Sequence, residues 1–345
     1  MKALVVGDSF CPADVFERAF SSLPWAGEVR YTEVDDGERL APGTPPEDGI
    51  REYAGVPRQL IAELEDEEVL IVHGAPVTAA VLDASPRLRL VCCARGGPVN
   101  IDVAAAAERG IAVTTTPGKN APAVADLTIA FLIMLARGVP QGQEFLKDGG
   151  SPGGSTFEGA RFLGHELDGQ ALGLVGYGQV GRAVAARARA FGMVVRAFDP
   201  FLNGRGPVDA AVELTDTLEA LIGAADFVSL HARATPENEN LLGEAQFARF
   251  RRGAYFVNTA RETLVDERAL REALRSGRLA GAALDVVRPA PGPHPLIGLD
   301  GVIVTPHMAG ATHETLARGA RMLADELERF AAGEPLRHSV NSIGA

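Results

Sequence analysis

The sequence predicts an α/β fold with two domains, each built on a parallel β-sheet. Short apolar runs alternate with helix-like segments along almost the whole chain, which is typical of βαβ units. The length of 345 residues suggests about two hydrophobic cores. A glycine-rich, weakly patterned break at residues 145–167 separates two halves that show the same kind of pattern.

The expected strands follow the apolar runs in order. The first half contains KALVVG, EVLIVHG, LRLVCCA and IAVTTTP, and the second half contains ALGLVGYG, VVRAFDP, DFVSLHA, AYFVNTA, AGAALDVV and GVIVTPH. One long helix is expected over residues 122–146, after the turn TPGKNAP, and another near the C-terminus with Gly333 as its stop. The acidic, Pro- and Gly-rich residues 36–58 predict a long exposed loop.

The composition is that of a globular chain and argues against several classes of partner. Hydrophobic residues make up 46% and charged residues 23%, and the net charge of −12 disfavours nucleic acid or an anionic membrane as the main partner. The longest apolar run, residues 127–136, has roughly half the length that a membrane span needs. Three cysteines cannot form a disulfide framework, so we expect a cytoplasmic protein.

The segment ALGLVGYGQVGRAV carries the clearest chemistry. Gly176, Gly178 and Gly181 fit the pattern G-x-G-x-x-G between a strand and a helix, where the helix N-terminus favours a pyrophosphate. Asp199 ends the next apolar strand, where its carboxylate can accept hydrogen bonds from ribose hydroxyls and would repel a 2′-phosphate. These residues predict a dinucleotide site that prefers NAD to NADP.

Downstream motifs follow in a fixed order: HARATPENENLLGEAQFARFRRGAYFVNTARETLVDERALREAL, then GAALDVV, then TPHMAGAT. Together with the glycine motif they resemble the D-isomer-specific 2-hydroxyacid dehydrogenases. The resemblance covers nearly the whole chain and is weakest in the first 65 residues. It implies two Rossmann- or flavodoxin-like domains with a cleft between them. Residues 1–115 with 312–345 would bind a small 2-hydroxy or 2-oxo acid, residues 116–311 would bind NAD, and the NAD domains would form a homodimer.

The resemblance also implies roles for individual residues. Arg261 matches the arginine that holds the substrate carboxylate and polarises its carbonyl, and His307 matches the acid/base histidine. The loop ARGGPVNID would hold the substrate carboxylate through Arg95, Gly96, Gly97 and Pro98. The implied cofactor contacts are Gly176, Gly178, Gln179, Val180, Gly181, Asp199, Thr259, Ala260, Asp285 and Gly310.

Lys119 and Asn120 could reach the cofactor or substrate, or they could cap the following helix. The substrate itself is not readable, although Arg51, Arg58 and Arg95 could bind a phosphate group.

One expected residue is missing. The family pairs its histidine with a glutamate in the pattern D-V-F-x-x-E-P, but the corresponding position here is Ala290. A histidine without a carboxylate partner loses orientation, and we expect reduction to weaken at neutral pH and recover as the pH falls. Glu262 is a candidate substitute, whereas His294, in a common HPL turn, is expected to be structural.

Two functions therefore remain open. One is an NAD-dependent dehydrogenase slowed by the missing glutamate, and the other is a non-catalytic NAD(H)-binding protein whose interactions depend on the cofactor. Formate oxidation on the same fold is a third idea that no segment specifically favours. No metal is expected.

Overall fold

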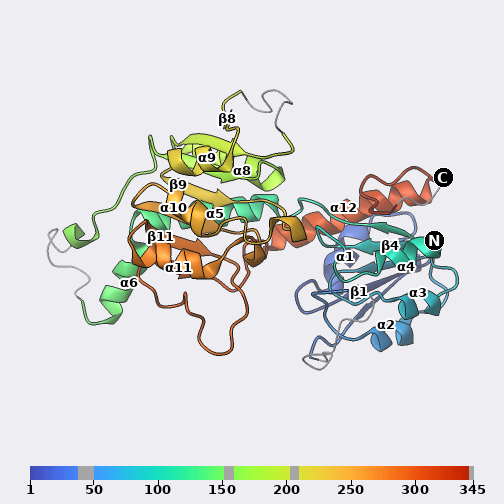
Figure 1. Ribbon diagram of the computed structural model, residues 1–345. Coiled ribbons are helices and arrows are strands. Elements are labelled where there is room, and N and C mark those ends of the chain that lie inside the picture. Colours follow the sequence, from blue (N-terminus) through green and yellow to red (C-terminus); the bar gives the residue numbers. More distant parts are fainter. Residues whose placement is uncertain (38–49, 151–158, 203–209, 342–345) are drawn as a thin grey trace. The chain divides into compact units, whose positions relative to one another are not determined.

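The computed structural model describes residues 1–37, 50–150, 159–202 and 210–341. Its contacts divide the chain into two compact units (Figure 1). Unit 1 is Met1–Lys119 with Thr312–Ala345, and unit 2 is Asn120–Ala311. The assignment of substrate binding to the first unit stays a prediction.

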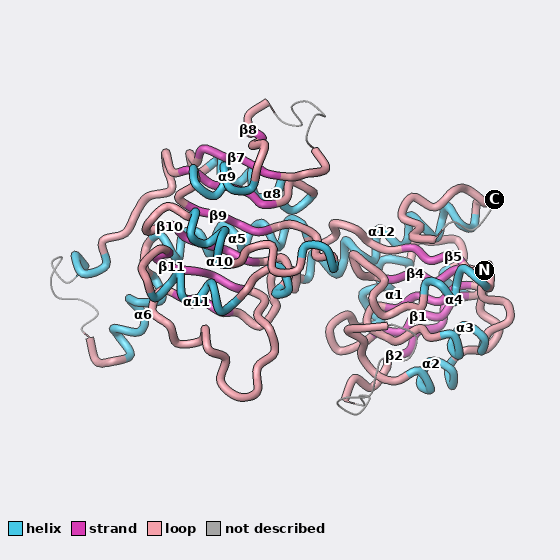
Figure 2. The backbone as a smooth tube through the Cα atoms, viewed as in Figure 1, coloured by secondary structure: helices cyan, strands magenta, loops and turns pink. Residues whose placement is uncertain are grey.

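Unit 1 is a five-stranded parallel sheet between two helical layers, with strand order β2-β1-β3-β4-β5 (Figure 2). Successive residues of a strand face opposite layers, so Leu4 packs with α2, α3 and α4, whereas Val5 packs with α1 and α12. The elements are β1 (Ala3–Gly7), α1 (Ala13–Phe20), η1 (Ala26–Glu28), β2 (Val29–Glu33), α2 (Pro57–Glu63), β3 (Val69–Val72), α3 (Ala79–Ala84), β4 (Leu90–Cys93), α4 (Val103–Glu108), β5 (Ala112–Thr114) and α12 (His313–Ala331).

Unit 2 is a seven-stranded sheet, also parallel, with strand order β12-β11-β10-β9-β6-β7-β8. Phe256 packs with α9, α10 and α11 on one face, and the next residue, Val257, packs with α5 and α8 on the other. The elements are α5 (Ala121–Ala136), α6 (Val139–Lys147), η3 (Ala160–Phe162), β6 (Ala171–Val175), α8 (Gln179–Ala190), β7 (Val194–Phe198), β8 (Glu213–Leu214), α9 (Leu218–Ala224), β9 (Phe227–Leu230), η4 (Pro236–Asn238), α10 (Glu244–Arg249), β10 (Ala254–Asn258), η5 (Glu262–Leu264), α11 (Glu267–Arg275), β11 (Leu279–Leu284) and β12 (Val302–Val304).

The predicted α/β class is confirmed, and each strand expected from an apolar run is present. The edge strands β2 and β8 were not expected. Gly333 has a φ of 69° and lies just beyond the end of α12, as predicted. Parts of the two expected loop regions, residues 38–49 and 151–158, lie outside the described residues.

The prediction of one helix over residues 122–146 was wrong. The chain forms α5 and α6 with a bend of 64° between them, and Gly138 at the break has a left-handed φ of 60°. A left-handed residue cannot continue an α-helix, and glycine adopts that conformation without strain. Among the described residues no single helix is long and apolar enough to cross a membrane, and α5 and α6 reach that length only as this bent pair.

Candidate active site

Three candidate residues of unit 2 lie just after the ends of three adjacent strands. Arg261 lies shortly after β10, Asp285 follows β11, and His307 lies shortly after β12. Because β10, β11 and β12 are parallel neighbours, their carboxyl ends meet at one edge of the sheet. Ligands of such sheets bind at this edge. The fold therefore brings the predicted catalytic residues to the edge where chemistry is expected.

The glycine loop follows β6, on the same edge. A Cβ on Gly176, whose φ is +94°, would lie 2.7 Å from the backbone nitrogen of Ala232. A Cβ on Gly181 would lie 2.4 Å from the carbonyl oxygen of Gly176. A Cβ on the exposed Gly178 would meet no atom within 4 Å. Two glycines are thus required by the protein's own packing, and the middle one leaves open space at the start of α8, where a pyrophosphate would fit.

Asp199 lies at the end of β7 and is half-buried. One carboxylate oxygen accepts a hydrogen bond from the backbone N–H of Tyr177 at 2.9 Å, and the other accepts from the N–H of Phe201 at 3.0 Å. The side chain therefore connects the glycine loop to the end of the neighbouring strand. Each carboxylate oxygen keeps further acceptor capacity, which suits a ribose hydroxyl.

Arg261 is exposed, and its guanidinium donates to the carbonyl oxygen of Ala260 at 2.7 Å. It forms no ion pair with a carboxylate in the described part of the chain. The buried Asn258 holds this loop, because its amide donates to the carbonyl of Arg261 and its oxygen accepts from the N–H of Ala260. Thr259 is buried, and its hydroxyl lies 3.3 Å from that of Thr128 on α5. An uncompensated cation on a fixed loop is suited to binding an anion.

His307 is exposed and has a left-handed φ of 53°. Its ring makes no hydrogen bond or ion pair with any residue in the described ranges. The buried carboxylate of Asp285 instead holds the turn on which His307 lies. It accepts from the Thr305 hydroxyl at 2.6 Å and from the N–H groups of Met308 and Ala309, both at 2.8 Å.

Within the described residues, no carboxylate of unit 2 forms a hydrogen bond or ion pair with the His307 ring. Ala290 is exposed in an irregular loop, and Glu262 begins η5 without a hydrogen bond to His307. The carboxylate of Glu267 interacts with His294 and Arg288 instead of His307. It lies 3.1 Å from Nε2 of His294 and accepts from the N–H of Arg288 at 2.7 Å. His294 therefore anchors the loop that follows β11, which agrees with the structural role expected for it.

His231 is a residue that the sequence reasoning missed. It follows β9, Nε2 of its ring lies 2.9 Å from the hydroxyl of Ser229, and Nδ1 is buried without a partner. Burial lowers the pKa of His231 to about 3, so the ring is neutral at ordinary pH. The sequence feature that could have identified His231 is its position directly after the apolar strand β9.

The predicted substrate loop lies in unit 1, after β4. Gly96 and Gly97 have open space around them, and no hydrogen bond in the described chain uses their N–H groups. Arg95 is already engaged, because its guanidinium donates to the carbonyl oxygen of Glu52 at 2.5 Å and to its carboxylate at 2.6 Å. The two glycine amides are thus better placed than the Arg95 guanidinium to receive a carboxylate.

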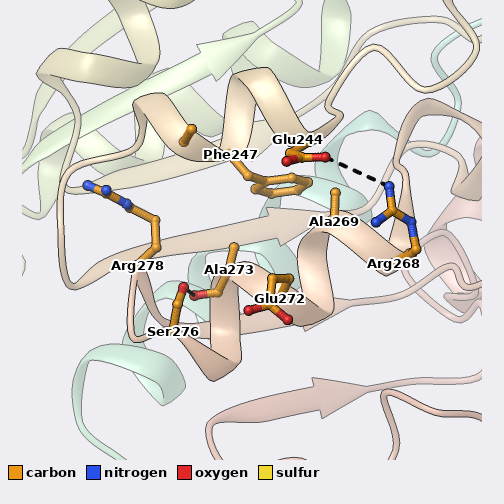
Figure 3. A pocket seen from close by; sticks show the side chains of 9 residues that line it. Glu244, Phe247, Arg268, Ala269, Glu272, Ala273, Ser276 and Arg278 are labelled. Atoms are coloured by element: carbon orange, nitrogen blue, oxygen red, sulfur yellow. Dashed lines mark hydrogen bonds and ion pairs between the residues drawn. The ribbon is translucent and has the colours of Figure 1, made fainter.

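A separate hollow of about 250 Å³ lies between α10 and α11 (Figure 3). The Phe247 ring lies within it, and Glu244 and Arg268 form an ion pair of 3.9 Å beside it. None of the predicted site residues lines this hollow. It is a surface feature apart from the candidate active site.

The glycine loop, Asp199 and the parallel sheet define a dinucleotide-binding α/β protein. Comparison with known proteins narrows this class. Residues 129–309 match the model of the D-isomer specific 2-hydroxyacid dehydrogenase NAD-binding domain.

The chain is 37% identical over 285 residues to D-3-phosphoglycerate dehydrogenase of Methanocaldococcus jannaschii, covering 82% of this chain and 53% of that protein. It is 40% identical to glyoxylate reductase of Korarchaeum cryptofilum, covering 82% of this chain and 85% of that protein. The crystal structure of the TT0316 protein from Thermus thermophilus aligns with a TM-score of 0.77 and 35% identity, covering 98% of this chain and 100% of that one.

The chain belongs to the D-isomer specific 2-hydroxyacid dehydrogenase family and contains its NAD-binding domain. It spans about half the length of the D-3-phosphoglycerate dehydrogenases that it matches.

Proposed function

We propose that this protein is an NAD-dependent oxidoreductase that interconverts a small D-2-hydroxy acid and its 2-oxo acid. The observation that carries the proposal is the meeting of Arg261, Asp285 and His307 at the carboxyl edge of β10, β11 and β12. These residue types supply a carboxylate-binding cation, a fixed turn and a proton-transfer group. When bound, NAD supplies the hydride acceptor and NADH the hydride donor.

Each residue has a defined task in this reaction. Arg261 binds the substrate carboxylate and polarises the C2 carbonyl, and its charge is available because no described carboxylate neutralises it. His307 takes the hydroxyl proton when the alcohol is oxidised and returns a proton to the carbonyl oxygen when the 2-oxo acid is reduced. In unit 1, the N–H groups of Gly96 and Gly97 are free of hydrogen bonds to described residues and are the proposed carboxylate donors of that unit.

For the cofactor, we propose the contacts that were predicted from the sequence. Gly176, Gly178, Gly181 and the first residues of α8, Gln179 and Val180, hold the pyrophosphate, and Asp199 accepts from the adenosine ribose. Because a carboxylate repels a 2′-phosphate, we expect NAD to be preferred to NADP. Thr259 and Ala260 contact the nicotinamide ribose. Asp285 contacts the nicotinamide amide, and Gly310 lies beside this part of the cofactor.

The absence of a glutamate partner for His307 slows this reaction without abolishing it. A positioned general acid or base contributes about 10²–10⁴-fold, and part of that contribution depends on orientation. In this chain the orientation comes from the Asp285 turn, which fixes the His307 backbone but leaves the ring unpaired.

We also propose a cytoplasmic homodimer formed through unit 2. The three cysteines are free and buried, which suits a reducing compartment. The edge strand β12 borders an apolar groove of about 370 Å³ lined by Val139, Ile297 and Val304 among others, and Ile297 is 61% exposed. Sedimentation equilibrium of the wild type and of Ile297→Asp tests this assembly.

The experiment that tests the function follows NADH consumption with a panel of 2-oxo acids, including hydroxypyruvate, glyoxylate and phosphohydroxypyruvate, from mildly acid to neutral pH. We expect turnover that rises toward acid pH and is lost in His307→Ala. Tight NADH binding without turnover on any substrate at any pH would favour the non-catalytic, cofactor-dependent interaction protein instead.

A further inference from the structure

Asp8, His73 and Lys119 lie at the carboxyl edge of the unit 1 sheet, after β1, β3 and β5, and have no role in the proposed reaction. Asp8 is buried and directly follows β1. One carboxylate oxygen accepts from the N–H groups of Phe10 and Cys11 at 3.0 and 2.8 Å. The other accepts from Nδ1 of His73 at 2.9 Å and from the N–H of Gly74 at 2.7 Å. Burial raises the pKa of Asp8, but these donors outweigh it and hold the pKa below its usual value.

His73, directly after β3, is oriented by this carboxylate. Donation from Nδ1 to Asp8 leaves Nε2 as the free ring nitrogen, and the ring stacks on Phe10 with centroids 5.2 Å apart. Nε2 makes no hydrogen bond to a described residue, and the side chain of His73 is 13% exposed. The Asp8–His73 pair thus has the carboxylate-to-histidine arrangement that His307 lacks, in the unit predicted to bind the substrate.

Lys119 is the third residue at this edge. It is 7% exposed, and its stem packs against α12 so closely that a Cβ on Gly319 would lie 2.9 Å from Cδ. Arg318 donates to its backbone carbonyl, but its ammonium group forms no hydrogen bond or ion pair within the described residues. Burial lowers the pKa of Lys119. Lys119 follows β5, and the N–H of Thr116 in the same segment donates to the carbonyl oxygen of Arg95, after β4, at 2.8 Å. Lys119 therefore lies at the carboxyl edge of the sheet that also carries Asp8 and His73.

A buried cation without a partner is costly, and chains rarely keep one unless a ligand or another charge compensates it. The carboxylate of Asp8, at the same edge of the sheet, already has four donors. Arg95 is neutralised by Glu52. Thr116, whose N–H donates to the carbonyl oxygen of Arg95, is fully buried, and its hydroxyl also has no partner. An anion brought by a ligand would satisfy Lys119, and the Nε2 of His73 could donate to the same anion when protonated.

We infer that Lys119 and His73 bind a second anionic group of the substrate, a carboxylate or a phosphate. The inference rests on the proposed function and makes it more specific. The preferred substrate would be a 2-hydroxy acid with two acidic groups, and Lys119 and His73 would hold the one that is remote from the reacting carbon.

The test compares matched 2-oxo acids with and without the second anion in NADH consumption. Phosphohydroxypyruvate with hydroxypyruvate tests a phosphate, and 2-oxoglutarate with 2-oxovalerate tests a carboxylate. We expect kcat/KM to favour one dianionic compound by about 10–100-fold, as one charge-assisted hydrogen bond allows. Lys119→Met should bring this ratio close to one, Lys119→Arg should keep part of it, and Lys147→Met, at an exposed lysine of α6, should keep the wild-type ratio. Equal ratios in the wild type and Lys119→Met would overturn the inference.

A binding experiment separates failure of this inference from failure of the proposed function. Inorganic phosphate and malonate should raise the melting temperature of the wild type and of Lys147→Met, but not that of Lys119→Met, whether or not any 2-oxo acid is turned over. If all three proteins are stabilised equally, or none is, Lys119 does not bind an anion.

Discussion

Asp285 and His307 are joined by a backbone hydrogen bond of 2.9 Å, from the N–H of His307 to the carbonyl oxygen of Asp285. The buried carboxylate of the same aspartate accepts three further hydrogen bonds from the turn that carries the histidine. One side chain therefore fixes the position of a candidate catalytic residue without touching its ring.

Removal of this carboxylate should affect stability and turnover together. Asp285→Ala leaves the N–H groups of Met308 and Ala309 without their acceptor. Because Ala309 is only 5% exposed, water cannot readily replace that acceptor, and we expect the unfolding free energy to fall by about 2–4 kcal/mol. Thr305→Val removes one of the three bonds and should cost less. Urea unfolding measures the stability of both variants, and NADH consumption measures their turnover. Similar stability of Asp285→Ala and Thr305→Val would show that the turn does not depend on the carboxylate.

The three glycines of the loop after β6 should respond differently to alanine. Gly181→Ala places a Cβ 2.4 Å from the Gly176 carbonyl and should destabilise unit 2 by about 1–3 kcal/mol. Gly178→Ala enters open space and should leave the melting temperature unchanged, while the Kd for NADH rises about 10–100-fold because the methyl group occupies the pyrophosphate position. Calorimetric unfolding and NADH titration measure the two effects. Wild-type NADH affinity in Gly178→Ala would place the pyrophosphate elsewhere.

Coenzyme preference should depend on the charge of Asp199. Asp199→Asn keeps one acceptor oxygen for the Tyr177 N–H but removes the repulsion of a 2′-phosphate. We expect the Kd for NADH to rise about 10–100-fold and the Kd for NADPH to fall. Asp216→Asn, at an exposed aspartate of the same unit, is the matched control. An unchanged ratio of the two Kd values would exclude Asp199 from the ribose site.

The buried His231 should make the protein sensitive to acid. Burial lowers the pKa of His231 to about 3, whereas the ordinary pKa of a histidine is 6.5. Below pH 6.5 the unfolded chain therefore gains a proton that the folded chain does not bind. The stability due to this group is complete above pH 6.5 and is lost as the pH falls toward 3.

We expect a loss of about 2 kcal/mol in unfolding free energy between pH 7.5 and pH 5, measured by urea unfolding. This part of the pH dependence should disappear in His231→Asn and persist in His165→Asn, at an exposed histidine. An identical pH dependence in all three proteins would mean that His231 is protonated in the folded state.

Much of the fold was predictable because strands such as β3 and β4 are continuous apolar runs, fully buried between two helical layers. The two missed strands lie at the sheet edges: β2 is only partly buried, and β8 has two residues. The break between α5 and α6 was missed because a single glycine in a helical pattern can remain helical, and only the backbone conformation of Gly138 decides.

The site was predictable only in part. Arg261 and His307 follow from motifs that are local in sequence, but the side-chain pairs at the carboxyl edge of the unit 1 sheet do not. The Arg95–Glu52 pair joins residues 43 positions apart, and the Asp8–His73 pair joins residues 65 positions apart. Such contacts arise because parallel strands place their carboxyl ends side by side, whatever their separation along the chain.

The most direct test of hydride transfer follows deuterium from NADH labelled at the transferred position into the product of the best 2-oxo acid. We expect one deuterium at C2 of a D-configured hydroxy acid, with the rate about 10²–10⁴-fold lower in His307→Ala and reduced in Arg261→Ala. NADH that stays labelled in the presence of every 2-oxo acid, while it binds tightly, would contradict a catalytic role for these residues.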